Sequence, residues 1–207
     1  QKENTAGGMI KFGIPDYAMK KEVLDNEVKF LAENGVNFEF GKELGKDITV
    51  ESIKAMGYEA IFAAIGSGKK VAADIKGADK AIDAVEFLKA IALVNAEKLC
   101  GNVVVAGKGF AAMDAARSAV RLGASHVTLL WSGNYPKGSF DAEALALAKE
   151  EGVVLIDNAS VEEIADGAGN QAEETQKATE KPIKSKEDIN DYFKFMFVGE
   201  TDELVKV

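Results

Sequence analysis

The spacing of apolar residues along the chain predicts a succession of helices and strands. Apolar residues at every third or fourth position predict helices at 19–34, 49–56, 83–95, about 112–122 and 141–150. Alternating or continuous apolar runs predict strands at 36–40, 58–65, 102–106, 126–131, 153–156 and 192–198. Because the run at 58–65 is mostly apolar, we expect that strand to be buried. The glycine-rich residues 1–18 are expected to form a loop.

Glycine and threonine mark where several of these helices end or begin. Three predicted helices are followed by a glycine, namely Gly35, Gly123 and Gly152, and Thr49 stands where another helix begins. Glycine readily adopts the left-handed backbone that ends a helix, and a threonine hydroxyl accepts from a free N–H of the first turn. We therefore predict that these residues are helix ends and a helix cap.

The middle of the chain has a regular order of elements. Between residues 102 and 156 the prediction is strand, helix, strand, helix, strand. Connections that contain a helix pair consecutive strands in parallel and cover a face of the sheet. We therefore predict the α/β fold class, with a Rossmann-like parallel sheet built on a βαβαβ unit.

A glycine pattern lies between the first strand of that unit and its helix. Gly107, Gly109 and Ala112 form G-x-G-x-x-A. The first glycine permits a tight turn, the second lets a diphosphate approach the backbone, and the alanine keeps the helix near the sheet. The helix N-terminus offers N–H groups and the positive end of its dipole. We predict a dinucleotide site at Gly107, Lys108, Gly109, Phe110, Ala111 and Ala112, with a tight turn that binds no ligand as the alternative.

The residues after the strand at 126–131 bear on which dinucleotide fits. An acidic residue there would bind a ribose 2′-hydroxyl, and an arginine would accept a 2′-phosphate. This chain has neither. Ser132 or Asn134 would hydrogen-bond a ribose, Lys137 would meet a phosphate, and Trp131 either flanks the adenine or belongs to the core. The sequence leaves NADP and NAD both open as the cofactor.

Composition and charge exclude several other classes of protein. The chain is 47% hydrophobic and 29% charged, which is typical of a soluble globular protein. The net charge of −9 argues against nucleic acid or an anionic membrane as a partner. With one cysteine and one histidine we expect no metal site, and the lone cysteine favours the cytoplasm. We assign no catalytic acid, base or nucleophile, because in dinucleotide chemistry the cofactor performs the difficult step.

A few polar residues have ordinary structural explanations. Arg117 and Arg121 lie one helical turn apart, and we expect them to form solvent-exposed salt bridges with Asp114. His126 begins a strand and is expected at the surface. Cys100 precedes a turn and is expected to be structural.

Several segments resemble the small (beta) subunit of NADPH-dependent glutamate synthase and its relatives, including the matching part of dihydropyrimidine dehydrogenase. The matching stretches occur in the same order, at 7–17, 21–25, 58–66, 83–88 and 107–117. The resemblance covers about residues 6–165, and 166–207 match nothing that we can place.

The resemblance implies an electron-transfer oxidoreductase in which a nicotinamide domain is inserted in a flavin domain. Electrons pass in that family from reduced nicotinamide to FAD, and often onward to iron–sulfur clusters. We expect a partial FAD-domain segment at 1–82, an NAD(P)-binding Rossmann-like domain at 83–165, a polar connector at 166–188 and a strand-containing segment at 189–207. The residues that would lie near FAD are Gly7, Gly8, Ala64, Ile65 and Gly66.

The chain also departs from the family pattern. The family's first flavin-binding glycine motif and its late Gly-Asp motif are absent, and Ser132 and Gly133 stand where the family has paired arginines. One cysteine cannot hold an iron–sulfur cluster. We therefore expect a fragment that is not active alone, binding NADP or NAD, with FAD only in the full-length enzyme. Its partners would be the remaining domains, or an iron–sulfur or flavin subunit; the alternative is a degenerate, non-catalytic nucleotide-binding or subunit-docking module.

Overall fold

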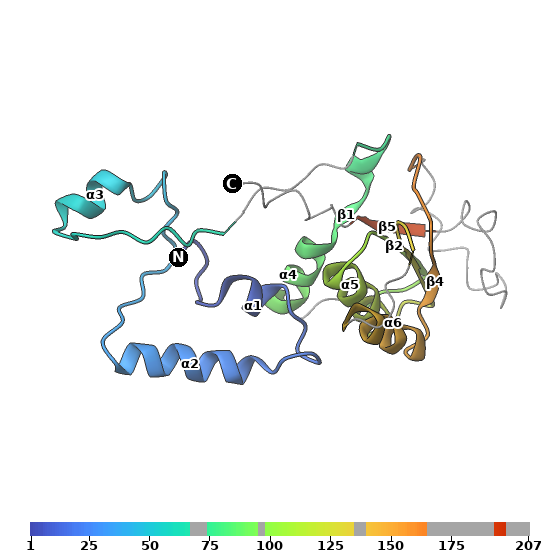
Figure 1. Ribbon diagram of the computed structural model, residues 1–207, viewed down its shortest axis with the longest axis horizontal. Coiled ribbons are helices and arrows are strands. Elements are labelled where there is room, and N and C mark those ends of the chain that lie inside the picture. Colours follow the sequence, from blue (N-terminus) through green and yellow to red (C-terminus); the bar gives the residue numbers. More distant parts are fainter. Residues whose placement is uncertain (67–73, 95–97, 135–139, 165–192, 198–207) are drawn as a thin grey trace. The chain divides into compact units, whose positions relative to one another are not determined.

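The computed structural model describes residues 1–66, 74–94, 98–134, 140–164 and 193–197 (Figure 1). The chain divides into two compact units, 1–70 and 71–207, and each is described by itself. Lys137 and the expected polar connector at 166–188 lie outside the described residues.

The second unit is built on a five-stranded sheet in the order β1-β5-β2-β3-β4. Its strands are β1 (Ile82–Asp83), β2 (Asn102–Ala106), β3 (His126–Leu130), β4 (Val154–Ile156) and β5 (Phe193–Phe197). Every pairing is parallel. The predicted α/β class with a Rossmann-like parallel sheet is confirmed.

Strand β5 is the predicted strand at 192–198, and it lies inside the sheet rather than at its edge. Asn102 of β2 pairs with Phe193 of β5 on one side and with His126 of β3 on the other. The chain leaves β2 toward β3 through α5, so β2 and β5 flank the point where the strand order reverses. Ligands of open parallel sheets bind outside the carboxyl ends of the strands at such a point.

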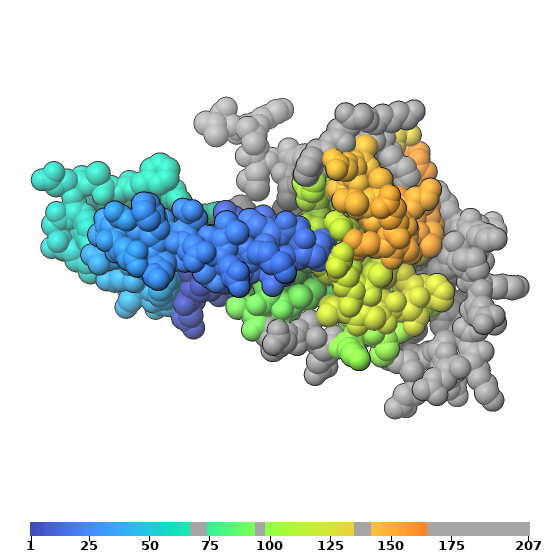
Figure 2. Space-filling view, turned by 90° about the horizontal axis from the view of Figure 1, so that it is seen from below, coloured from blue at the N-terminus to red at the C-terminus, as the bar shows by residue number. Residues whose placement is uncertain are grey.

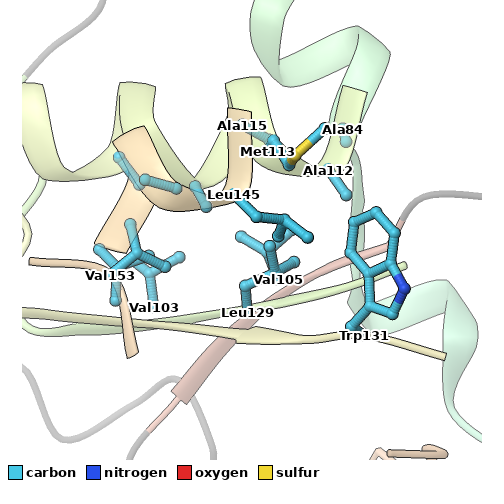
Figure 3. Packing of buried hydrophobic residues seen from close by; sticks show 14 of the residues in the cluster. Ala84, Val103, Val105, Ala112, Met113, Ala115, Leu129, Trp131, Leu145 and Val153 are labelled. Carbon is cyan, nitrogen blue, oxygen red and sulfur yellow. The ribbon is translucent and has the colours of Figure 1, made fainter. Parts of the chain in front are cut away.

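Helices α4 (Ala84–Val94), α5 (Phe110–Arg121) and α6 (Phe140–Glu150) cover one face of this sheet. Figure 3 shows α5 lying along the strands, with Val105 and Leu129 pointing up toward it. Four residues of α5 are fully buried alanines, which let the helix approach the strands closely: Ala112, Ala115, Ala116 and Ala119. The alanine series therefore fixes where the N-terminus of α5 lies relative to β2.

The opposite face of the sheet has a smaller core. Val104, Ala106 and Leu130 are buried there together with Ala159. Thr128 pairs in register with Val104 and is also buried, and its hydroxyl has no hydrogen-bond partner among the described residues. This face thus contains one polar atom whose loss of hydration is uncompensated.

The segment before β1 and the segment after β4 are joined. The Ile164 N–H donates to the carbonyl of Lys76 over 2.8 Å, and the Lys76 ammonium lies 2.6 Å from the Glu163 carboxylate. Gly77 has a φ of 79°, and a Cβ there would lie 2.1 Å from the Ile164 carbonyl oxygen. Only glycine allows the two backbones to come this close.

The predicted helix ends and cap are confirmed. After α5, the Gly123 N–H donates to Val120 and the Ala124 N–H donates to Ala119, the hydrogen-bond pair of a Schellman motif. The same pair closes α2 and α6 at Gly35 and Gly152. The Thr49 hydroxyl accepts from the Ser52 N–H and caps α3.

The described part of the first unit is helical and contains no strand. Its helices are α1 (Gly8–Phe12), α2 (Lys21–Glu33) and α3 (Val50–Ala55). Helix α1 lies in the stretch expected to be a loop, so that prediction is wrong. The Lys21 ammonium donates to the carbonyls of Ile10 and Ile14, and it thereby satisfies acceptors at the C-terminal end of α1.

The predicted strands at 36–40 and 58–65 are not formed, and the second is not buried. Phe62 is 94% exposed, and Tyr58 and Ile65 are also exposed. A strand needs a neighbour for its backbone groups, and the described residues of this unit offer only an isolated bridge between Leu44 and Ile48. Apolar pattern alone therefore does not make a strand here.

Helix α2 is covered only in part, on the side where α1 lies. None of its residues is buried, although Val23, Phe30 and Leu31 lie along it. In Figure 2 the surface of the first unit that faces the viewer is formed in part by α2, in blue. The first unit thus exposes many of the apolar side chains that its sequence pattern predicts to be covered.

Candidate functional site

The glycine loop leaves β2 and is fastened to the end of β3. The Gly107 N–H donates to the Leu130 carbonyl over 3.0 Å. Gly107 has a φ of 153°, and Gly109, which is the N-cap of α5, has a φ of 80° and a ψ of −175°. Side chains disfavour this backbone at Gly109, so the loop needs glycine at that position.

The space beside Gly109 is open. Among the described residues, a Cβ built on Gly109 meets no atom within 4 Å apart from its chain neighbours, so none of their side chains occupies the place where a ligand would approach the backbone. The N-cap glycine has no side chain with which to cap the first turn of α5. The N–H groups of that turn and the positive end of the helix dipole therefore fit a diphosphate. The shape of the loop leaves room for a dinucleotide, and binding of one at these residues stays a prediction.

The other predicted residues of the loop hold or border this opening. Ala112 is fully buried and packs α5 against the sheet, and the Met113 N–H donates to the Gly109 carbonyl over 3.3 Å. Lys108 and Ala111 are partly buried, and Phe110 is 48% exposed. The loop is therefore packed against the sheet at Ala112 and accessible to solvent at Phe110.

The residues after β3 were predicted to meet the rest of a dinucleotide, and the structure separates their roles. Trp131 is 5% exposed and belongs to the core; Figure 3 shows its ring at the end of the cluster, below Ala112. Ser132 and Asn134 are exposed beyond it. Trp131 was expected either to flank the adenine or to belong to the core, and its surroundings are those of a core residue. A ribose contact by Ser132 or Asn134 stays a prediction.

Asn158, which was not among the predicted site residues, joins the loops after β3 and β4. The Asn158 N–H donates to the Gly133 carbonyl over 2.9 Å, and its side-chain Nδ2 donates to Asn134 Oδ1 over 3.1 Å. The Trp131 N–H also donates to Ile156. A sequence signal did exist, because a polar pair, Asp157-Asn158, ends a strand at the ligand-binding edge of a parallel sheet.

The two arginines of α5 lie away from this opening. Arg117 Nη2 donates to Glu151 Oε1 over 2.6 Å, and Arg121 Nη2 donates to the same oxygen over 2.8 Å. The expectation of a solvent-exposed Arg117 is wrong, since its side chain packs against Glu151 and is only 13% exposed. Hydrogen bonding by Arg117, then by Arg121, lowers the pKa of Glu151 below its ordinary value, against the effect of burial. Arg117 is eight residues from Gly109, or about 12 Å along the helix, so this cluster lies away from the glycine loop. It joins α5 to Glu151 at the end of α6.

His126 and Cys100 lie at the opposite end of the strands from the glycine loop. His126 is exposed, as predicted, and its Nδ1 lies 3.0 Å from Asn102 Oδ1. Cys100 is an exposed free thiol. The described residues include no cluster of His, Cys, Asp and Glu suited to a metal ion, and none of their helices is long and apolar enough to span a membrane.

The residues expected near FAD belong to the first unit. Ala64, Ile65 and Gly66 are exposed. A Cβ on Gly7 would lie 2.4 Å from the Leu24 side chain, whereas one on Gly8 would meet nothing within 4 Å. The backbone at Gly7, with a φ of 112°, favours glycine, while the Leu24 side chain could shift away from a Cβ there. Contact of any of these residues with FAD stays a prediction.

Comparison with known proteins agrees with the resemblance. The family model described as pyridine nucleotide-disulphide oxidoreductase matches residues 3–198. The beta subunit of the NADP(+)-dependent formate dehydrogenase of Moorella thermoacetica is 34% identical over 154 residues, which are 72% of this chain and 22% of that protein. The beta subunit of the NADPH-Fe(3+) oxidoreductase of Geobacter sulfurreducens is 31% identical over 156 residues, covering 73% of this chain and 23% of that subunit.

The small chain of the NADPH glutamate synthase of Escherichia coli is 29% identical over 164 residues, covering 71% of this chain and 34% of that protein. The predicted likeness to glutamate synthase small subunits is thus confirmed. The chain spans between 22% and 34% of the length of these three relatives.

Proposed function

The chain belongs to the pyridine nucleotide-disulphide oxidoreductase family, and from that premise we propose that residues 83–165 are the nicotinamide dinucleotide-binding module of a flavin-dependent enzyme. The family and the named relatives support a redox module. The finer proposal is that this module serves electron transfer from NAD(P)H to FAD in a larger enzyme like the glutamate synthase small subunit.

The open glycine loop is the observation on which this proposal rests. Gly109 leaves space for a diphosphate, and the N-terminus of α5 directs N–H groups and a positive dipole end into that space. Ala112 and its buried neighbours hold the helix in place. When bound, the dinucleotide supplies a hydride, and this chain's residues bind and orient it.

The division of the chain suggests how the remaining parts contribute. We propose that 1–82 is part of the flavin domain, with Gly7, Gly8 and 64–66 on its flavin side, and that 189–207 returns to complete the sheet through β5. FAD would be held only in the full-length enzyme. Relatives that are named as subunits support a partner subunit as the electron acceptor.

Titration of the full chain with NADH, NADPH, ADP-ribose and 5′-ADP tests the proposal. We expect saturable binding that Gly109→Val removes, because valine is strained at this φ and fills the space needed by the diphosphate. The matched control is Gly101→Val, since Gly101 has a φ of 82° and open space but lies before β2, at the other end of the strand. Binding that survives in Gly109→Val, or is lost equally in Gly101→Val, contradicts the proposed site.

A second candidate function is a non-catalytic subunit-docking module. The exposed apolar side chains of the first unit, including Phe30, Phe62 and Ile65, favour it. The absence of charge at Ser132 and Gly133, where the family has arginines, favours it too. This candidate predicts no saturable binding of any nucleotide, so the same titration separates the two functions.

A further inference from the structure

Asn158 and Asn134 form a link between two loops at the edge of the sheet where the glycine loop lies. Asn158 binds Gly133 through its backbone N–H at 2.9 Å and Asn134 through its side chain at 3.1 Å. The next residue adds a third hydrogen bond, from the Ala159 N–H to the Trp131 carbonyl at 3.1 Å. The position of the loop tip after β3 is therefore set by residues that follow β4.

The backbone of Asn158 is unusual. Its φ of 48° makes it the one non-glycine residue with a positive φ in the part of the chain that the structure describes. Asparagine tolerates this left-handed conformation better than most residues, but it still costs free energy. The conformation aims both the N–H and the side-chain amide of Asn158 at the same tip.

This link determines what Asn134 offers to a ligand. Since Asn134 Oδ1 accepts from Asn158, the N–H groups of Asn134 are the part of its amide turned to other partners, and they suit an uncharged hydroxyl oxygen. The described residues of the two loops, Ser132 to Asn134 with Asp157 and Asn158, include no cation and one carboxylate, and the described cation of this edge, Lys108, lies in the glycine loop. A 2′-phosphate would need a cation, commonly arginine.

Resting on the proposed function, we propose that Asn134 binds the ribose 2′-hydroxyl of the dinucleotide and that Asn158 is the positioning residue for it. The site then selects NADH over NADPH, although the three relatives above are named for NADP or NADPH. The observation that supports this selectivity is the hydrogen bond between two asparagines from different loops.

Affinities of the full chain for 5′-ADP and 2′-deoxy-5′-ADP test this positioning. We expect the hydroxyl to improve binding about fivefold, as one hydrogen bond does. Asn158→Gly keeps the positive φ without strain but removes the amide, and there the ratio of the two affinities should fall to about one. A purely structural role for Asn158 would weaken both nucleotides together and leave the ratio unchanged.

Asn158→Asp is the conservative variant. Aspartate also tolerates the left-handed backbone, and it accepts from Asn134, whose oxygen then turns toward the ribose and accepts from the 2′-hydroxyl. The ratio of the affinities for 5′-ADP and 2′-deoxy-5′-ADP should therefore persist. The affinity for 2′,5′-ADP should be lower than in the unaltered chain. Loss of the ratio in this variant as in Asn158→Gly contradicts the positioning role.

Comparison of 2′,5′-ADP with 5′-AMP tests the selectivity. Tighter binding of 2′,5′-ADP that Lys137→Ala abolishes would overturn the inference and leave the proposed function standing. If the ratio of the affinities for 5′-ADP and 2′-deoxy-5′-ADP is the same in the unaltered chain and in Asn158→Gly, the inference is also overturned while the proposed function stands. If none of the nucleotides binds, the proposed function fails, and the inference fails with it.

Discussion

The Gly107 N–H donates to the Leu130 carbonyl, so the turn that opens the candidate dinucleotide site is anchored to the neighbouring strand. The anchor extends the β2–β3 pairing by one residue beyond Ala106. The tip after β3 is in turn held by Asn158. The candidate site is therefore supported from two strands besides the one that it follows, which is the rigidity that a preorganised binding site requires.

We predict that Thr128→Val stabilises the second unit. The Thr128 hydroxyl is buried without a partner among the described residues, and valine has nearly the same shape without the polar atom. The free energy of unfolding should rise by about 1 kcal/mol, measured by urea denaturation. Val127→Thr, which adds a hydroxyl on the opposite face of the same strand, should instead lower it by about 1–3 kcal/mol. A destabilised Thr128→Val variant would show that the hydroxyl has a partner.

We predict that the Glu151 cluster makes stability dependent on acid pH. Arginine hydrogen bonds lower the pKa of Glu151 in the folded chain, so its contribution is complete above the ordinary value of 4.5 and is lost as pH falls through the lower folded value. Glu151→Gln should reduce the free energy of unfolding by about 1 kcal/mol at neutral pH, and this difference should shrink below pH 4.5. Denaturant melts across pH measure it.

Glu163→Gln is the control for that experiment. Its partner Lys76 has a side chain that is 77% exposed, and exposed pairs contribute little. We expect a pH profile like that of the unaltered chain. A profile for Glu151→Gln that parallels the unaltered chain throughout would contradict the role assigned to the cluster.

We predict that Gly77→Ala is strongly destabilising. The added Cβ would lie 2.1 Å from the Ile164 carbonyl oxygen, so one of the two backbones has to move. Thermal melts should show that the free energy of unfolding falls by at least about 2 kcal/mol. Gly101→Ala has a similar φ, 82°, and open space, so it should cost only about 1 kcal/mol. Equal losses would mean that φ alone, and not the close approach, matters at Gly77.

We predict that polar substitution on the first unit reduces self-association without loss of fold. Phe30 is 59% and Phe62 is 94% exposed, so Phe30→Ser and Phe62→Ser remove apolar surface from water contact at little cost, within about 0.5 kcal/mol. Light scattering should fall, and the melting temperature should stay the same. Unfolding of either variant would show that its phenylalanine is covered.

Local patterns in the sequence predicted most helices and strands of the second unit, though not the short strand β1, and they failed for the strands expected in the first unit. The run at 102–106 became β2 and the small-residue helix after it became α5, because both found neighbours within the same βαβ unit. The run at 58–65 has the apolar pattern of a strand and formed none, because a strand is completed by a partner that no local pattern supplies.

The same limit applies to the site. The glycine loop is a local motif, and the geometry at Gly109 agrees with it. Arg117 binds Glu151, which is 34 residues away, and helical spacing around Arg117 pointed only to the nearby Asp114. Asn158 was missed for the same reason, since its hydrogen bond to Asn134 joins residues 24 apart.

The junction of Lys76 with Ile164 also has a mechanical meaning. The two segments are parallel, so tension applied toward the N-terminus on one and toward the C-terminus on the other would load the bridge in shear. Tension on the chain before Lys76 would then be borne by this bridge before it reached β1, whereas the chain beyond Ile164 also enters the sheet directly, through β5.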